Sequence, residues 1–159
     1  MEKNFDIKLL STNRNIKEIT KQAKKFKVKN VIICDYDKFI EARKKYKKSK
    51  INFYNSFSII KKLFKKKELF YSMISITGID GLSPSLELIK YSKNVAIVNK
   101  EAIICGWNLI VKQLKNFKTN FIPIDSEHFS IYSLIDNNKH DLIDRVYITA
   151  SGGHFLKNL

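Results

Sequence analysis

Short apolar runs alternate with longer amphipathic segments along the chain. Short apolar runs are typical of buried strands, and apolar positions three and four residues apart are typical of helices. The runs predict strands at Phe5–Leu10, Val31–Cys34, Ile51–Tyr54, Tyr71–Ile76, Val95–Val98, Asn120–Ile124 and Arg145–Thr149. The helical spacing predicts helices at Asn15–Phe26, Asp37–Lys48, Ser56–Lys66, Lys100–Phe117 and Phe129–Ile135, and one more that Ser83 caps and Pro84 begins. Because strands and helices alternate with short connections, the sequence predicts an α/β fold built on a parallel sheet.

The composition is that of a folded domain. Hydrophobic residues make up 44% of the 159 residues and charged residues 28%, which leaves ample material for a core. No apolar run approaches the roughly 18–20 residues that a membrane span needs, and the first residues lack the apolar stretch of a signal peptide. Two cysteines, Cys34 and Cys105, are too few for a disulfide framework or a cysteine-rich zinc site. We therefore expect a cytoplasmic protein with no membrane partner.

The net charge of +15 admits a nucleic acid as a partner. However, 27 of the 30 basic residues are lysines, whereas nucleic-acid binders tend to use arginine for bidentate contacts. The chain is also rich in Ile and Asn and poor in Ala and Gly, a bias typical of AT-rich genomes. The lysine-rich stretches 44–50 and 61–67 lie on predicted helices and just past them, as solvated faces would. Compositional drift is the favoured explanation, and nucleic-acid binding is the weaker alternative.

Polar clusters follow three of the predicted strands. In an open parallel sheet, ligands bind beyond the carboxyl ends of the strands, so these clusters are the places to look for chemistry. They are Asn99-Lys100-Glu101 after Val95–Val98, Asp125-Ser126-Glu127-His128 after Asn120–Ile124, and Ser151-Gly152-Gly153 after Arg145–Thr149. We expect the three clusters to line one edge of the sheet.

Each cluster has two interpretations. Asp125 and Glu127 are two apart, so on an extended segment their carboxylates converge and would share a cation such as Mg²⁺ or Mn²⁺. Equally well, Asp125 caps the next helix and Glu127 favours its dipole. Lys100 is a phosphate or carbonyl ligand, or an ordinary first-turn lysine. Ser151 and the glycines after it offer backbone N–H groups to a phosphate, or form a simple turn.

Four segments in order resemble one enzyme family: Ile79–Pro84, Asn99–Glu101, Pro123–His128 and Thr149–Gly153. They are similar to 1-deoxy-D-xylulose 5-phosphate reductoisomerase, the NADPH-dependent enzyme of the non-mevalonate isoprenoid pathway. The similarity spans nearly the whole chain. It implies an incomplete Rossmann-like sheet with helices on both faces over residues 1–117, which bind NADPH. It also implies that residues 118–159 begin an α+β catalytic domain that binds metal and substrate.

The resemblance implies a role for each polar cluster. Asp125 and Glu127 would hold a divalent cation, Mg²⁺, Mn²⁺ or Co²⁺, and with Lys100 they would be the catalytic residues. The phosphorylated sugar substrate would contact Lys100, Ser126, Glu127 and Ser151. The residues near NADPH would be Asn13, Arg14, Asn15, Asn99 and Glu101, with Arg14 supplying positive charge for the adenosine 2′-phosphate. The reaction implied is the reductive isomerisation of 1-deoxy-D-xylulose 5-phosphate to 2-C-methyl-D-erythritol 4-phosphate.

The chain also departs from the family pattern. No glycine-rich turn for the pyrophosphate precedes Phe5, and the family's third metal carboxylate and C-terminal helical domain are missing. Asn13 stands where the family has glycine, and His154 where it has proline. We therefore expect a fragment that is inactive alone, although full-length members of the family are expected to be homodimers. The alternatives are a non-catalytic remnant or one piece of a split enzyme.

Overall fold

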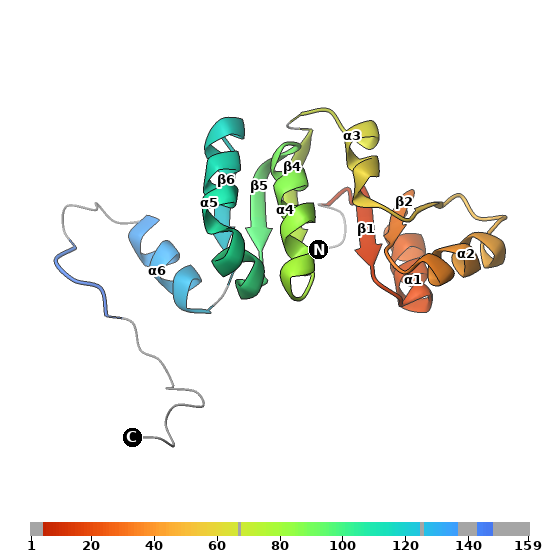
Figure 1. Cartoon of the computed structure of the whole chain (residues 1–159), viewed down its shortest axis with the longest axis horizontal. Helices are drawn as coiled ribbons and strands as arrows, with labels where there is room; N and C mark the ends of the chain where they lie inside the picture. Colours follow the sequence, from red (N-terminus) through yellow and green to blue (C-terminus); the bar gives the residue numbers. More distant parts are fainter. Residues whose placement is uncertain (1–4, 67, 125, 137–142, 148–159) are drawn as a thin grey trace, which may run out of the picture. The chain divides into compact units, whose positions relative to one another are not determined.

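The computed structural model describes residues 5–66, 68–124, 126–136 and 143–147. The chain forms two compact units, residues Met1–Lys65 and Lys66–Leu159. Each unit is built on three parallel strands joined by helices (Figure 1). Among the described residues, none of the helices combines the length and the apolar character needed to span a bilayer.

The first unit contains the sheet β1-β2-β3, with strands β1 (Leu9–Thr12), β2 (Asn30–Ile33) and β3 (Asn52–Tyr54). Helices α1 (Ile16–Lys25) and α2 (Tyr36–Lys45) make the two crossovers between parallel strands. The apolar face of α1 is buried against β1 and β2, since helical spacing brings its apolar residues to one side. One buried hydrophobic cluster of this unit consists of Ile16, Ile19, Ala23, Val28, Val31, Ile33 and Ala42, and Ile32 and Ile60 are also fully buried.

The second unit contains the sheet β4-β5-β6, with strands β4 (Leu69–Ile74), β5 (Ser92–Ile97) and β6 (Asn120–Pro123). Its helices are α4 (Leu82–Ile89), α5 (Lys100–Phe117) and α6 (Ser126–Asp136). β5 is the central strand and its residues Val95, Ala96 and Ile97 are fully buried, as expected for a strand covered on both faces. Lys118 ends α5 in the left-handed conformation, with φ of 48°.

Most of the predicted elements are present, and the predicted α/β fold with parallel strands and helices on both faces is confirmed. The helix predicted at Lys100–Phe117 has those bounds in the structure. The helix predicted at Ser56–Lys66 is wrong in its length. It consists of the 3₁₀ turn η1 (Phe57–Ile59) and the single α-turn α3 (Ile60–Leu63). It ends because Phe64 is extended and buries its ring, with 7% of the residue exposed.

Further predictions also differ from the structure. The strand predicted at Phe5–Leu10 begins only at Leu9 and runs to Thr12. Ser83 is not an N-cap, because the 3₁₀ turn η2 (Ile79–Gly81) runs into α4, which begins at Leu82. Pro84 is still within the first helical turn, where a missing N–H breaks no intrahelical bond. The strand predicted at Arg145–Thr149 is not formed by residues 145–147, and its last two positions lie outside the described residues.

Candidate functional site

The turn between β1 and α1 carries three exposed polar residues, Asn13, Arg14 and Asn15. Asn15 caps α1: its Oδ1 accepts a hydrogen bond from the Glu18 backbone N–H at 3.1 Å. The Asn15 backbone N–H donates to the Thr12 hydroxyl at 3.3 Å, which fixes the entry to the helix. The turn therefore sits at the electropositive end of a ten-residue helix, where an anion is favoured.

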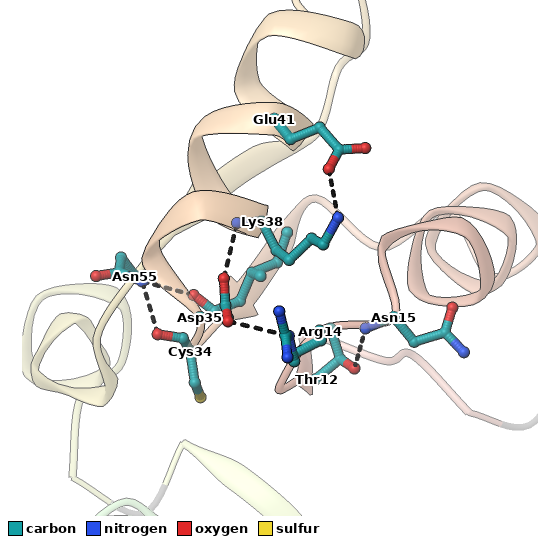
Figure 2. Close-up of polar contacts among 9 residues, drawn as sticks. Thr12, Arg14, Asn15, Cys34, Asp35, Lys38, Glu41 and Asn55 are labelled. Carbon is teal, nitrogen blue, oxygen red and sulfur yellow. Dashed lines mark hydrogen bonds and ion pairs between the residues drawn. The ribbon is translucent and has the colours of Figure 1, made fainter.

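Arg14 is held by a residue from the neighbouring turn (Figure 2). Its Nε lies 3.0 Å from Oδ2 of Asp35, which lies two residues after the end of β2. The Arg14 side chain is 67% exposed and that of Asp35 is 23% exposed. The other carboxylate oxygen of Asp35, Oδ1, accepts from the Lys38 backbone N–H at 2.9 Å and so caps α2. One carboxylate thus joins the start of α2 to the turn before α1.

Backbone hydrogen bonds join the same two turns. The Cys34 N–H donates to the Thr12 carbonyl at 3.0 Å, and the Asp35 N–H donates to the Asn13 carbonyl at 3.1 Å. On the other side of β2, the Asn55 side-chain amide donates to the carbonyls of Ile33 and Cys34, at 2.8 and 3.0 Å (Figure 2). The strand end that carries Asp35 is therefore bonded from both neighbouring strands.

A second ion pair lies on the first two turns of α2. Lys38 Nζ is 2.7 Å from Glu41 Oε2, and both side chains are substantially exposed. The hydrogen bond from Lys38 lowers the pKa of the Glu41 carboxyl, and the positive charges of Lys38 and Lys45 act in the same direction. This pair engages the Lys38 ammonium, whereas only the backbone N–H of Lys38 contacts Asp35.

In the second unit, a buried asparagine joins the ends of β4 and β5. Asn99 directly precedes α5 and is only 7% exposed. Its side-chain amide donates to the carbonyls of Ile76 and Gly78, in the segment after β4. Its Oδ1 accepts from the Ala102 backbone N–H at 3.1 Å and caps α5. Both amide hydrogens of Asn99 are therefore engaged within the protein.

The segment after β4 is closely packed against this asparagine. A Cβ built on Gly81 would lie 2.8 Å from the Ile76 carbonyl oxygen and 3.3 Å from Asn99 Nδ2. Gly78 has φ of 69° and ψ of −171°, a conformation that is essentially restricted to glycine. The backbone from Ile76 to Gly81 thus has one tightly specified path beside the start of α5.

The structure brings only some of the predicted site residues together. Asn99, Lys100 and Glu101 lie at the start of α5, with Lys100 and Glu101 exposed. Asp125 and Ser151 lie outside the described residues. Ser126 and Glu127 are in the first turn of α6, and their side chains are not described. Within the described part of the chain, no group of three or more His, Cys, Asp or Glu residues could hold a metal ion.

Asp35 and Asn55 are two further polar residues at strand ends, and they were not among the predicted site residues. Asp35 follows the buried run Val31–Cys34 directly, so the rule that singled out Asn99 and Asp125 applied to it as well. Asn55 likewise follows the strand that ends at Tyr54. The signal was therefore present in the sequence for both residues.

Parallel strands with helical crossovers and polar turns at the strand ends define a Rossmann-like α/β protein. Residues 1–106 match the family model of 1-deoxy-D-xylulose 5-phosphate reductoisomerase. Residues 121–159 match the model of its C-terminal domain. The chain belongs to the 1-deoxy-D-xylulose 5-phosphate reductoisomerase family.

Individual relatives agree with the family match. The chain is 53% identical over 155 residues to the reductoisomerase of Pelagibacter ubique, covering 97% of this chain and 40% of that protein. It is 33% identical to the Clostridium acetobutylicum enzyme, covering 95% of this chain and 40% of that one. Among solved structures, the Zymomonas mobilis reductoisomerase in complex with NADPH matches 97% of this chain and 41% of its own. That match has a TM-score of 0.82 and 27% identity. The chain thus spans about 40% of the length of the curated relatives it matches.

Proposed function

We propose that this chain provides the cofactor-binding part and the start of the catalytic part of a 1-deoxy-D-xylulose 5-phosphate reductoisomerase. The reaction is the NADPH-dependent conversion of 1-deoxy-D-xylulose 5-phosphate to 2-C-methyl-D-erythritol 4-phosphate, in non-mevalonate isoprenoid biosynthesis. The observation that carries the proposal is the family match over residues 1–106 and 121–159. It is supported by 53% identity to the Pelagibacter ubique reductoisomerase.

The proposed cofactor is NADPH, which supplies the hydride when it is bound. The turn Asn13–Asn15 would receive the adenosine 2′-phosphate, because it combines an exposed guanidinium with the N-terminus of α1. Asn99 and Glu101 would lie near the same cofactor. Since both amide hydrogens of Asn99 are engaged, Asn99 would meet a cofactor through its backbone or its remaining Oδ1 lone pair. The Zymomonas mobilis relative was solved with NADPH.

The proposed substrate and metal residues come from the start of α5 and the segments beyond β6. The Lys100 ammonium would bind an anionic oxygen of the phosphorylated sugar, with Ser126, Glu127 and Ser151 as further contacts. Asp125 and Glu127 would bind Mg²⁺, Mn²⁺ or Co²⁺, since carboxylate oxygens suit these hard cations. The support for this set is the order and spacing of the motifs in the sequence.

The proposed domain boundary lies between Phe117 and Lys118. Residues 1–117 would bind NADPH, and residues 118–159 would begin the catalytic domain. In support, the two family models leave residues 107–120 between their matches. A homodimer and a cytoplasmic location are further proposals, which light scattering and fractionation of the source cells would test.

The test of the reaction is genetic complementation. The reading frame that encodes the chain, with its genomic flanks, is introduced into a bacterium whose own reductoisomerase gene is deleted and which is kept alive on 2-C-methyl-D-erythritol. Growth without that supplement, lost in Asp125→Asn and Glu127→Gln variants, supports the proposal. Absence of growth favours a non-catalytic remnant. Growth that does not depend on Asp125 contradicts the metal assignment.

The test of the cofactor turn is binding to the purified 159-residue chain. Adenosine 2′,5′-bisphosphate is compared with adenosine 5′-monophosphate, which differs only in lacking the 2′-phosphate. We expect the bisphosphate to bind more tightly, and Arg14→Ala to abolish the difference. Arg43→Ala is the matched control, because Arg43 lies in the last turn of α2, at the opposite end from Asp35. Equal binding of both nucleotides by the unmodified chain would contradict the assignment of the turn.

A further inference from the structure

We infer that Asp35 is a positioning residue that holds Arg14 ready for the 2′-phosphate and thereby sets the preference for a 2′-phosphorylated nucleotide. The inference rests on the proposed function of the turn Asn13–Asn15. Its basis is the ion pair between Arg14 Nε and Asp35 Oδ2, at 3.0 Å (Figure 2). Asp35 itself makes no contact with the phosphate and acts through Arg14.

The ion pair with Asp35 engages the Nε side of the Arg14 guanidinium. An arginine has one N–H on Nε and two on each Nη, and a phosphate is gripped best by two parallel N–H groups. Among the described residues, the guanidinium of Arg14 has no ion pair besides the one at Nε. Because the side chain is 67% exposed, its Nη groups are accessible to a ligand. The contact with Asp35 therefore anchors the side chain without using the groups that a phosphate needs.

Asp35 can hold Arg14 in place because three sets of hydrogen bonds fix the position of Asp35 itself. Its backbone N–H donates to the Asn13 carbonyl, one residue before Arg14. Its Oδ1 accepts from the Lys38 N–H, which orients the carboxylate so that Oδ2 faces Arg14. The residue before it, Cys34, is bonded on both sides, by Thr12 and by the Asn55 amide. A carboxylate on a longer, fully exposed side chain would not restrict the Arg14 side chain in this way.

Two physical effects of Asp35 on phosphate binding have opposite signs. Anchoring reduces the rotamer freedom that Arg14 loses on binding, so it strengthens the interaction. The negative charge of Asp35 repels the phosphate and weakens it. We expect anchoring to prevail. Arg14 is 67% exposed, so water and salt screen the repulsion between Asp35 and a phosphate bound there, whereas they do not offset the loss of rotamer freedom. Removal of the carboxylate therefore distinguishes the two effects by the sign of the change.

The experiment uses the full 159-residue chain and the ratio of its affinities for adenosine 2′,5′-bisphosphate and adenosine 5′-monophosphate. Asp35→Ser removes the carboxylate but keeps a good N-cap for α2, since serine caps about as well as aspartate. We expect the ratio to fall by about two- to five-fold, the range that the strength of exposed ion pairs allows. A general loss of folded protein would lower both affinities and leave the ratio unchanged.

The matched control is Asp37→Ser. Asp37 lies in the first turn of α2 and is exposed, and the ion pair of Arg14 is with Asp35 instead. The control therefore removes the same negative charge without removing a contact to Arg14. We expect an unchanged or slightly raised ratio. Asp35→Asn keeps the cap and a neutral acceptor, so it should fall between Asp35→Ser and the unmodified chain. If the serine variant fails to fold, the affinity ratio of Asp35→Asn tests the inference in its place.

The double variant Arg14→Ala/Asp35→Ser completes the cycle. With Arg14 absent, Asp35→Ser should lower the ratio no further, because its effect passes through Arg14. An unchanged ratio in Asp35→Ser with both affinities retained, or a raised ratio, would overturn the inference, and a raised ratio would identify Asp35 as a repelling charge. If the unmodified chain prefers neither nucleotide, the proposed function of the turn fails first. If it prefers the bisphosphate even in Arg14→Ala, only the assignment to Arg14 fails, and the inference with it.

Discussion

The turn after β1 and the segment after β4 occupy equivalent places in their sheets, yet they are stabilised in different ways. After β1, the side-chain contact between neighbouring turns is an ion pair between Arg14 and Asp35 in which the arginine is 67% exposed. After β4, it depends on Asn99, which is 7% exposed and spends both amide hydrogens on backbone carbonyls. The first arrangement is charged and solvent-exposed, and the second is uncharged and buried.

The difference separates two kinds of residue at a sheet edge. A buried polar group left without its partner is costly, so a residue such as Asn99 determines whether the edge folds. An exposed ion pair contributes little to stability, so a residue such as Arg14 can be specialised for a ligand. Substitutions in the second unit should therefore change folding, while those in the turn of the first unit should change ligand preference.

The largest effect is expected for Asn99→Asp. Aspartate keeps the oxygen that caps α5, but it replaces the amide with an oxygen facing the carbonyls of Ile76 and Gly78. Two hydrogen bonds are lost and a carboxylate is placed in a buried site, which together should cost about 3–5 kcal/mol. Amide hydrogen exchange, read at the start of α5, measures the loss for this unit alone.

Asn108→Asp is the control for that substitution. Asn108 lies on the same helix, is exposed, and undergoes the same change of amide to carboxylate. It should leave exchange in α5 nearly unchanged, because surface substitutions away from special contacts have small effects. Equal protection in the two variants would mean that the Asn99 amide does not hold the segment after β4.

A smaller loss is expected for Gly81→Ala. The added methyl would lie 2.8 Å from the Ile76 carbonyl oxygen, which belongs to the backbone and cannot simply rotate away. Crowding of this kind costs about 1–3 kcal/mol. Thermal unfolding of Gly81→Ala should show the loss, and Gly106→Ala gives a useful comparison. There the added methyl would lie 2.2 Å from Leu82 Cδ1 and 2.8 Å from Cδ2, but these atoms end a half-buried side chain whose rotation would relieve the overlap. A milder effect at Gly81 than at Gly106 would contradict the close packing between Gly81 and the Ile76 carbonyl.

Arg14→Ala should change stability by less than about 1 kcal/mol, because the ion pair it removes is exposed on the arginine side. The backbone bonds between the two turns and the cap by Asp35 remain in this variant. Urea unfolding of the first unit, followed by exchange in α1, should therefore match the unmodified chain. A loss as large as that of Asn99→Asp would show that the two edges are stabilised alike.

The sequence predicts the elements well where local signals agree. The predicted bounds of α5 rest on a sustained apolar spacing up to Phe117, and the structure adds that Asn99 caps the first turn. The helix at Ser56–Lys66 was overextended because Phe64 fits the helical spacing, whereas its burial requires an extended backbone. That burial depends on contacts distant in sequence, which periodicity does not contain.

The candidate site was less predictable than the fold. Arg14 and Asp35 meet only because β1 pairs in parallel with β2 in one register, with Thr12 opposite Ile33. The hydrogen bonds from the buried Asn99 amide to the carbonyls of Ile76 and Gly78 likewise require the glycine turn after β4 and the pairing of β4 with β5. The resemblance to the family placed Asn99 near a cofactor, but it carried no information on the carbonyls that Asn99 binds. The roles of Asp125, Ser126, Glu127 and Ser151 stay predictions.

The smallest effect is expected at Glu41, which pairs with Lys38 at 2.7 Å on the exposed surface of α2. Because the pKa of Glu41 is lowered in the folded state, its contribution to stability is present above the pKa of the unfolded state. That contribution is lost as the pH falls through the lowered pKa. Glu41→Gln should therefore leave the urea midpoint nearly unchanged at neutral pH, and the two curves should merge in acid. A clear drop at neutral pH would mean that exposed ion pairs of this unit hold its fold. The exposed ion pairs and the buried Asn99 hydrogen bonds would then differ only in how much each contributes to stability.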